Sequence, residues 1–280
     1  MEKIYGIIGD PVAHSLSPVM HNAAFGECCM DCIYLAFRVP KAELEDAIKG
    51  AKSLGIDGIN VTRPLKEEAL AFVDADDVAK KIGAINTIDF SSGLPVGYNT
   101  DGIGSIQALR ESVGEIKGKN ILILGAGGAA MAIAFYIDAA GAEVTIANRT
   151  KERAVQLAFK LTNAAAIGIG TDIKKDRELE KQLKRADILI NATSAGMYPD
   201  VNTTLVNADM MHPDLVVFEI VYNPVETKLL REARRAGVKQ IIDGVKMLVY
   251  QGAAAFKIWT KEEPPIAVME TAVRNALRYK

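Results

Sequence analysis

The sequence has little of what builds disulfide-rich, membrane or nucleic-acid-binding proteins. Its 280 residues include only three cysteines and three histidines, and 33 basic side chains nearly balance 35 acidic ones. No block of like charge favours nucleic acid or a membrane surface as a partner. The N-terminal apolar run ends at Asp10 and Pro11, well short of signal-peptide or membrane-spanning length, so we expect a cytoplasmic protein.

The cysteines Cys28, Cys29 and Cys32 all fall in the stretch ECCMDC. The C-x-x-C spacing of the last two is typical of metal or redox sites. A zinc site needs about four ligands, however, and no second Cys/His pair accompanies this one. A redox dithiol would follow a strand and open a helix, whereas these residues end a helical pattern. We interpret them as reduced packing residues and predict no metal.

Strand-like and helix-like segments alternate along the chain. The first alternation runs strand, helix, strand, helix, strand through KIYGII, SPVMHNAAFGE, IYLAFRV, KAELEDAIKGAKSLG and DGINVT. A second alternation begins with NILILGAGGAAMAIAFYIDAAGAEVTIANRT. This order predicts an α/β protein with mainly parallel sheets. We expect an N-terminal domain of residues 1–100 and a Rossmann-type dinucleotide-binding domain of residues 101–240, which opens with a helical segment from about Asp101 to Val113. Residues 241–280 have a helical pattern and could cap the second domain or return to the first.

A glycine-rich turn lies near the start of the second domain. Gly125, Gly127 and Ala130 form a G-x-G-x-x-A pattern directly after an apolar strand and at the start of a helix. The first glycine permits a tight turn, the second lets a pyrophosphate approach the backbone, and the small third residue lets helix and strand pack closely. This context favours a dinucleotide site over a turn kept for packing alone.

The residues after the next predicted strand indicate which dinucleotide binds. About twenty residues beyond the glycine turn, an NAD site has an acidic side chain for the ribose hydroxyls. This chain has Asn148, Arg149 and Thr150 there, with Arg153 one turn later. A guanidinium suits a 2′-phosphate and offers no acceptor to a free hydroxyl. The sequence therefore favours NADP, and a solvated arginine at a helix start is the alternative.

The segment HSLSPVMHN combines helix-start signals with hydroxyl groups. Ser17 suits the N-cap and Pro18 the first helical position, while Ser15 lies just outside. Hydroxyls and free N–H groups at a helix start can hold a carboxylate, although Ser17 could equally be only a cap. His14 and His21 have no visible carboxylate partner nearby, so we assign them no acid–base role.

Three polar turns follow apolar stretches of the first domain. They contain Asn60 and Thr62, then Asn86, then residues 99–101. Ligands of open α/β sheets bind beyond the carboxyl ends of the strands, so these turns can converge on one pocket. Their amide and hydroxyl groups both donate and accept, as a polyhydroxylated substrate requires. Each could also serve its turn alone.

Lys66 stands at the start of a predicted short amphipathic helix, in GINVTRPLKEEALAF. It precedes Glu67 and Glu68 on a polar face, where most lysines are solvated. The preceding NVT turn and the carboxylate of Asp101 in NTDG favour chemistry instead. Whether Lys66 would move a proton or mainly hold a charge stays open.

With these pieces in order, the chain resembles the shikimate dehydrogenase family over nearly its whole length. The resemblance is carried by GDPVAHSLSPVMHNAAF, GINVTRPLKEEA, GAINT, GYNTDGIG, GAGGAA, NRT, NATSAGM, VYNPVETKLL and GVKMLVYQGAAAFKIW. It implies NADPH-dependent reduction of 3-dehydroshikimate to shikimate in aromatic amino-acid biosynthesis, in a cleft between the two domains. It also implies that the last helices return to the first domain.

The resemblance implies roles for individual residues. The catalytic pair would be Lys66 and Asp101. These two would also bind the substrate, together with Ser15, Ser17, Thr62, Asn86, Tyr222 and Gln251. The pyrophosphate would lie on Gly125, Ala126, Gly127, Gly128 and Ala129. The adenosine phosphate would contact Asn148, Arg149, Thr150, Lys151, Glu152 and Arg153. The nicotinamide would lie near Ile220, Gly244 and Met247, and Asp77 is a further cofactor contact.

Three positions, Arg63, Leu65 and Glu219, depart from the family pattern, and none is expected to handle the hydride. An NAD-dependent quinate or dual quinate/shikimate dehydrogenase is one alternative. Such members tend to have an acidic residue after NR and a threonine at the second serine of SLS, where this chain has Thr150 and Ser17. A non-catalytic NADP-binding regulator is another, which the retained catalytic pair disfavours. The sequence does not distinguish a monomer from a homodimer.

Overall fold

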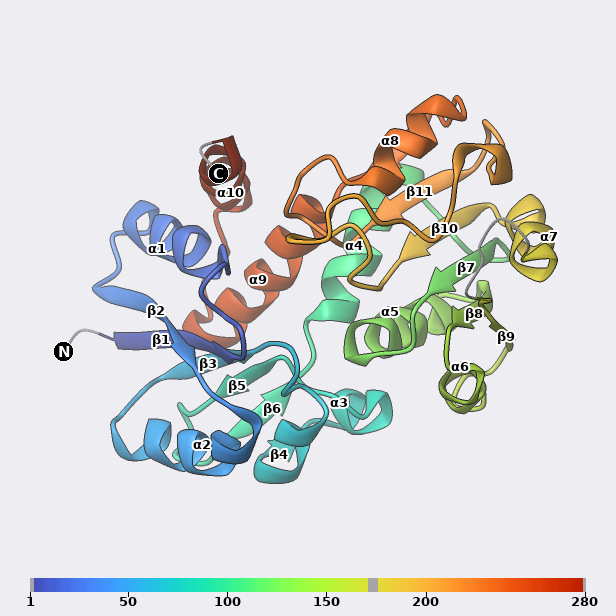
Figure 1. The fold of residues 1–280 in the computed structure, drawn as a ribbon. Helices are drawn as coiled ribbons and strands as arrows, with labels where there is room; N and C mark the ends of the chain where they lie inside the picture. The colour runs from blue at the N-terminus through green and yellow to red at the C-terminus, as the bar shows by residue number, and fades with distance from the viewer. Residues whose placement is uncertain (1–2, 171–175, 279–280) are drawn as a thin grey trace. The chain divides into compact units, whose positions relative to one another are not determined.

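The computed structural model describes residues 3–170 and 176–278, which belong to two compact units. Unit 1 comprises Met1–Gly104 and Val249–Lys280, and unit 2 comprises Ser105–Leu248. Helices α4 (Asp101–Val113) and α9 (Gly244–Thr260) each contribute residues to both units (Figure 1). The predicted helix over 101–113 is confirmed as α4.

Unit 1 contains a six-stranded sheet with the order β2-β1-β3-β5-β6-β4. Strand β1 is parallel to β2 and β3, and β4 is parallel to β6. Strand β5 is antiparallel to both of its neighbours, and the short connection to β6 allows a hairpin. The strands are β1 (Lys3–Gly9), β2 (Cys32–Arg38), β3 (Gly58–Val61), β4 (Asp74–Ala75), β5 (Thr87–Asp89) and β6 (Val96–Tyr98).

The helices of unit 1 cover this sheet and fix its core. The indole Nε1 of Trp259 on α9 donates a hydrogen bond to the carbonyl of Ile88 at 3.0 Å. Gly58 on β3 makes room for that ring, because a Cβ there would lie 2.3 Å from Nε1. At the C-terminus, α10 packs against α1 (Figure 1). The remaining helices are α1 (Ser17–Glu27), α2 (Leu44–Ser53), α3 (Asp77–Ile82) and α10 (Ile266–Arg278).

The start of α1 differs from the prediction, because Leu16 and not Ser17 is its N-cap. Leu16 is buried and fixes the entry of the chain, so the helix begins at Ser17 itself. The side chain that accepts from the first turn is Ser15, whose Oγ takes the N–H of Ser17 at 3.2 Å. The short helix predicted after Lys66 is a 3-10 segment, Glu68–Phe72, which ends where Val73 turns extended.

Unit 2 contains a six-stranded, fully parallel sheet with the order β12-β11-β10-β7-β8-β9. This is the strand order of a doubly wound dinucleotide-binding fold, with the direction of winding reversing between β7 and β10. The predicted fold class is therefore confirmed. The strands are β7 (Asn120–Leu124), β8 (Glu143–Asn148), β9 (Ala164–Gly168), β10 (Ile188–Asn191), β11 (Val216–Glu219) and β12 (Gln240–Ile242).

The central strands of unit 2, β7 and β10, are buried runs of Ile and Leu, as expected for a parallel sheet covered on both faces. Helices and the segment 205–215 supply the apolar residues that pack against it, including Leu179, Val206 and Leu230. The helices are α5 (Gly128–Ala139), α6 (Lys151–Ala158), α7 (Arg177–Arg185) and α8 (Lys228–Arg235), with a 3-10 turn at Ala208–Met210.

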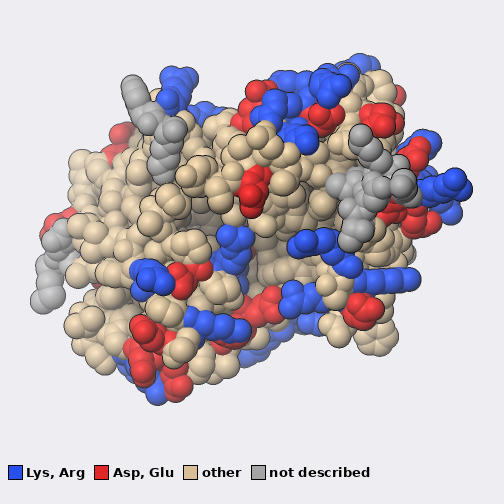
Figure 2. Space-filling model, viewed as in Figure 1, with Lys and Arg blue, Asp and Glu red and all other residues tan. Residues whose placement is uncertain are grey.

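The described residues hold no disulfide, metal-binding cluster or membrane-spanning helix. No disulfide joins the three cysteines, and within residues 3–170 and 176–278 no cluster of three or more His, Cys, Asp and Glu side chains is placed to hold a metal. Within the same ranges, no helix combines the length and the apolar character needed to cross a membrane. Basic and acidic side chains are interspersed over the face shown in Figure 2.

Candidate functional site

A lysine–aspartate pair stands out in unit 1. The Nζ of Lys66, in the loop after β3, lies 2.5 Å from Oδ2 of Asp101, the first residue of α4. Their side chains are only 19% and 6% exposed, so water screens the pair weakly. Leu65, next to the lysine, is fully buried and anchors this loop in the core, while Arg63 is exposed.

Asn86 joins this pair to two other segments. Its Nδ2 donates to Oδ1 of Asp101 at 2.9 Å, to Oγ1 of Thr100 at 2.9 Å and to Oε1 of Gln251 at 3.3 Å. Its Oδ1 accepts the N–H of Thr100 at 2.7 Å. One buried amide thus brings together the segment before β5, the start of α4 and helix α9. Four predicted site residues, Lys66, Asn86, Asp101 and Gln251, are neighbours.

Behind Asn86 lies a second asparagine whose hydrogen bonds are directed into the core. The Oδ1 of Asn60 accepts the hydroxyl of Tyr34 at 2.7 Å. Its Nδ2 donates to the carbonyl of Asn86 at 3.1 Å and to Oγ1 of Thr87 at 3.0 Å. The prediction that Asn60 lies in a turn was wrong, because it is a residue of β3 and pairs with Thr87 of β5. Sequence reasoning also missed Tyr34, which is 26 residues away and sits in an apolar strand pattern. Asn60 therefore supports the position of Asn86.

The remaining predicted substrate residues of unit 1 occupy two places. Ser15 and Ser17 lie at the start of α1, where Ser17 is buried and Ser15 is half-buried. Thr62 follows β3 and its N–H bonds the carbonyl of Ile8 at 2.9 Å. A Cβ on Gly9 would lie 2.4 Å from Cγ2 of Thr62, so this glycine gives the threonine its space.

His21 is a buried group that the sequence did not single out for chemistry. It is 0% exposed, neither ring nitrogen has a hydrogen-bond partner among the residues that the structure describes, and its ring stacks on Tyr34 with centroids 4.5 Å apart. Burial lowers the pKa of His21 to about 3. The ring is therefore a neutral member of an aromatic core.

In unit 2 the glycine turn links β7 to α5. Gly125 has φ +112°, which residues with a side chain rarely adopt, and a Cβ there would lie 2.9 Å from the carbonyl oxygen of Ala192. A Cβ on Gly127, in contrast, would meet no atom of the described part of the chain within 4 Å. Packing within the chain therefore accounts for the first glycine and leaves the second facing open space. Ala126, Gly128 and Ala129 are partly buried around it.

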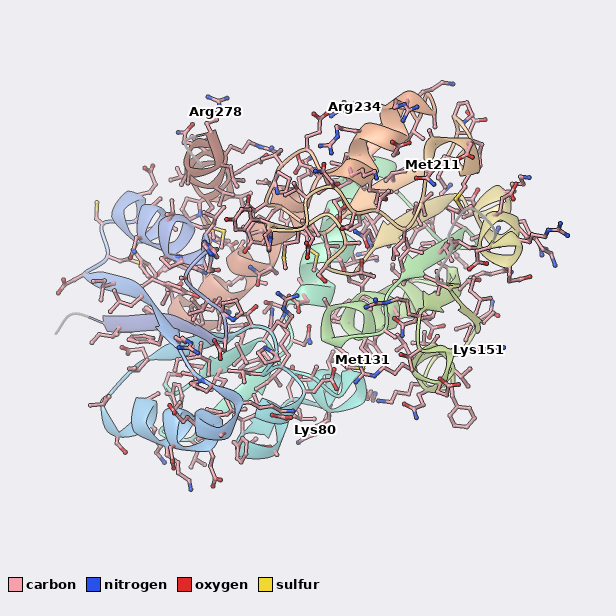
Figure 3. The ribbon with its side chains drawn as sticks, in the orientation of Figure 1. Lys80, Met131, Lys151, Met211, Arg234 and Arg278 are labelled. Carbon is pink, nitrogen blue, oxygen red and sulfur yellow. The ribbon has the colours of Figure 1, made fainter. Side chains whose placement is uncertain are left out.

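A basic segment follows the neighbouring strand. β8 ends at Asn148, whose Nδ2 donates to the carbonyl of Thr150 at 2.9 Å and so shapes the turn into α6. The next residues leave their side chains exposed: Arg149, Thr150, Lys151, Glu152 and Arg153. Figure 3 labels Met131 and Lys151, which lie in the first turns of α5 and α6.

The predicted nicotinamide residues Ile220, Gly244 and Met247 follow β11 or begin α9, and the predicted substrate residue Tyr222 lies beside them in the sequence. Ile220 and Tyr222 are partly buried, and Met247 is buried. Gly244 is required by close packing, because a Cβ there would lie 2.4 Å from the carbonyl oxygen of Val221. Asp77 is an exposed residue in the first turn of α3 and belongs to unit 1.

The carboxyl ends of β7, β8, β10 and β11 lie at one edge of the unit 2 sheet, since these strands are parallel. They lead into the glycine turn, the Asn148 turn, the segment after Asn191 and the segment after Glu219. In doubly wound sheets, ligands bind at this edge, where the winding reverses. The helix start after the glycine turn adds free N–H groups that suit a phosphate.

Glu219, the last residue of β11, is the least expected group at this edge. It is 0% exposed and accepts hydrogen bonds from Asn191, Val221 and Thr227. Burial raises its pKa to about 7, although these hydrogen bonds act in the opposite direction. The sequence signal for Glu219 was its departure from the family pattern, at the end of the strand VVFE.

Comparison with known proteins matches both units. Residues 7–88 match the shikimate dehydrogenase substrate binding domain, residues 107–222 the shikimate / quinate 5-dehydrogenase family, and residues 244–274 the shikimate 5'-dehydrogenase C-terminal domain. The shikimate dehydrogenase (NADP(+)) of Methanococcoides burtonii is 57% identical, with 99% of each chain covered.

Solved structures give the same result. A shikimate dehydrogenase in complex with NADP+ is 44% identical with a TM-score of 0.89, covering 98% of this chain and 96% of that one. The enzyme of Thermus thermophilus, in complex with NADP(H) and shikimate, is 37% identical with a TM-score of 0.88, covering 98% and 100%. The chain belongs to the shikimate dehydrogenase family.

Proposed function

We propose that the protein catalyses the reversible, NADPH-dependent reduction of 3-dehydroshikimate to shikimate, a step of aromatic amino-acid biosynthesis. The observation that carries this proposal is the Lys66–Asp101 pair, held with Asn86 and Gln251 in a chain 57% identical to a shikimate dehydrogenase (NADP(+)). Unit 1 offers the substrate-binding groups, and unit 2 offers the cofactor-binding edge.

The residues present in unit 2 fit NADP. Gly127 faces open space at the start of α5, where the backbone N–H groups of the first turn can receive the pyrophosphate. The exposed guanidinium groups of Arg149 and Arg153 follow β8, where a 2′-phosphate can be bound with paired hydrogen bonds. We propose that Ile220, Gly244 and Met247 flank the nicotinamide, and Asp77 stays a prediction from the family resemblance.

The ketone reduction needs a hydride and a proton, and the developing alkoxide needs stabilisation. The reduced nicotinamide supplies the hydride when bound. We propose that Lys66 bonds the oxygen at C3, stabilises its negative charge and gives it a proton, and that it accepts the proton in the oxidation. Asp101 holds the ammonium in place at 2.5 Å. Because the pair is largely buried, stabilisation of charge is strong there.

Other groups of unit 1 bind the substrate in this proposal. The hydroxyls of Ser15 and Ser17 at the start of α1 hold the carboxylate, helped by free N–H groups. The ring hydroxyls are bound by Thr62, Asn86, Asp101 and Gln251, of which the last three share hydrogen bonds through Asn86. Tyr222, in unit 2, stays a prediction from the family resemblance.

The direct test is absorbance at the reduced-nicotinamide band after the purified protein is mixed with shikimate and NADP+. We expect a rise with this pair. A comparison of kcat/KM for shikimate and quinate with NADP+ and NAD+ then measures the preference. No rise with shikimate and NADP+ would contradict the proposal, and a preference for quinate and NAD+ would favour the alternative enzyme.

We further propose that the protein is cytoplasmic, a compartment in which its three free cysteines would stay reduced. Its oligomeric state is open, with a homodimer as the alternative to a monomer. Light scattering on the purified protein measures the molar mass directly. Fractionation of cells shows the location.

A further inference from the structure

Glu219 has no part in the proposed chemistry, yet it is a fully buried acid at the cofactor edge. Its Oε1 accepts the N–H of Val221 at 2.9 Å, and its Oε2 accepts the hydroxyl of Thr227 at 2.9 Å. The Nδ2 of Asn191 lies 2.9 Å from Oε1 and 3.1 Å from Oε2. Burying a carboxyl is costly, and apolar residues of similar volume often serve stability as well or better. Its presence here therefore calls for another explanation.

The partners of Glu219 belong to two adjacent strand ends. Asn191 ends β10 and Glu219 ends β11, and the two residues are paired in the parallel register. The Oδ1 of Asn191 accepts the N–H and the hydroxyl of Thr193, at 3.2 Å and 2.7 Å. One carboxyl thus fixes the turn after β10 through Asn191 and the segment after β11 through Val221.

Both of these segments are packed against the glycines of the cofactor edge. The position of a Cβ on Gly125 is 2.9 Å from the carbonyl oxygen of Ala192 and 3.1 Å from Cγ2 of Thr193. The position of a Cβ on Gly244 is 2.4 Å from the carbonyl oxygen of Val221. A shift of the turn after β10 would therefore disturb the packing of the glycine turn, and a shift of the segment after β11 would disturb the packing of the start of α9.

We propose that Glu219 is a positioning residue for the cofactor, tying the ends of β10 and β11 together so that the glycine turn and residues 220–222 keep their binding geometry. This inference rests on the proposed function of unit 2 as the NADP-binding unit. Glu219 acts through Asn191 and Val221 and does not itself touch the cofactor. All the contacts involved lie within unit 2.

The test compares Glu219→Ala, Glu219→Gln and Glu219→Asp with the wild type. The readouts are the Kd for NADP+ from calorimetry and the KM for shikimate. We expect Glu219→Ala to raise the Kd about tenfold, equivalent to ~1.4 kcal/mol. Glu219→Gln keeps the size but turns an amide N–H toward a donor, so we expect a rise of about threefold. Glu219→Asp keeps the carboxyl group and should bind most like the wild type.

The KM for shikimate should change less than the Kd for NADP+, because Tyr222 is the one predicted substrate residue in segment 220–222 and the others lie in unit 1. Leu183→Ala is the matched control, since Leu183 is equally buried in unit 2 but lies before the amino end of β10. It should lower the melting temperature without weakening NADP+ binding. Asn191→Ala should weaken NADP+ binding, and adding Glu219→Ala should weaken it little further.

The outcomes separate the two proposals. If the wild type does not bind NADP+, the proposed function of unit 2 fails. If the wild type binds and folded Glu219→Ala or Glu219→Gln binds equally well, the positioning role fails alone. An equal loss of NADP+ affinity in Leu183→Ala would also overturn it, because general destabilisation would then explain the effect. Should Glu219→Ala not fold, Glu219→Gln decides.

Discussion

The two units build their candidate sites from different material. Unit 1 offers side chains, since Lys66, Asn86, Asp101 and Gln251 present charged and amide groups joined in one hydrogen-bonded set. Unit 2 offers backbone, since its glycine turn and helix start place N–H groups at the sheet edge. In unit 1 the chemical group is the residue itself. In unit 2 the side chains next to the glycine turn stand behind the surface and hold it, and the exposed arginines after β8 are the exception.

Substitutions in the two units should therefore have different effects. A change in the Lys66 group removes a reacting or binding atom and should leave the fold nearly intact. A change behind the glycine turn leaves the binding atoms present but moves them. Changes in the Lys66 group should therefore alter turnover, and changes behind the glycine turn should alter the affinity for the cofactor.

The largest effect is expected for Lys66→Ala. Loss of the ammonium removes charge stabilisation and proton transfer, so kcat should fall by roughly 10²–10⁴-fold. The Kd for NADP+ should stay within about twofold, because Lys66 lies in unit 1. Steady-state kinetics and calorimetry measure the two quantities. Lys80→Ala is the control, as that lysine is exposed and paired with Asp74 at 3.3 Å. Near-normal turnover of Lys66→Ala would remove Lys66 from the mechanism.

A second test separates the two glycines of the turn. Gly125→Ala should lower the free energy of unfolding by about 1–3 kcal/mol, because φ +112° strains an alanine and its Cβ meets Ala192. Gly127→Ala should change it by less than about 0.5 kcal/mol. Both variants should weaken NADP+ binding. Gly127→Ala should do so only because its methyl group occupies space that the cofactor would fill. Unchanged binding by Gly127→Ala would mean that the pyrophosphate does not approach there.

Cofactor preference should depend on the exposed arginines after β8. Combining Arg149→Ala with Arg153→Ala should lower kcat/KM for NADP+ about ten- to a hundredfold, the range for losing hydrogen bonds to a charged group. The value for NAD+ should change little. Arg234→Ala is the control, since Arg234 is exposed on α8 and paired with Glu226 at 3.1 Å (Figure 3). An equal loss with both cofactors would contradict a role at the 2′-phosphate.

The smallest effect contrasts the buried titratable groups of the two units. The pKa of His21 is lowered from 6.5 to about 3, so its contribution to stability is present above pH 6.5 and is lost as the pH falls. The pKa of Glu219 is raised from 4.5 to about 7, so its contribution is present below pH 4.5 and is lost as the pH rises through 7.

Denaturant titrations between pH 4.5 and 7.5 can show this contrast. The stability difference between wild type and His21→Phe should shift in favour of the wild type as the pH rises. The difference between wild type and Glu219→Gln should shift the other way. Each slope should stay below about 1.4 kcal/mol per pH unit, the limit for one proton. If the stability of each variant changes with pH in parallel with that of the wild type, burial does not shift the pKa of His21 or of Glu219.

Sequence reasoning succeeded where the information is local. Helix α4, the turn at Gly125 and the end of β8 at Asn148 each follow from adjacent residues, and the structure has them where they were predicted. The start of α1 was misplaced because burial of Leu16 prevails over the capping preference of Ser17. Local preference is weak compared with tertiary packing.

The supporting contacts could not be read from the sequence. Tyr34 bonds Asn60 across 26 residues, and Asn191 bonds Glu219 across 28. Such pairs depend on which strands become neighbours, which no short window contains. Glu219 was visible only as a departure from the family pattern. The sequence thus predicts the residues that face ligands better than those that hold them in place.

The packing of Trp259 has a practical consequence. It is the one tryptophan of the chain, it is buried, and it lies against Tyr5 and the Gly58 strand within unit 1. Its fluorescence therefore reports the unfolding of unit 1 alone, whereas circular dichroism records both units. Coincident transitions by the two signals would show that the units unfold together, and separated transitions would give each unit its own stability.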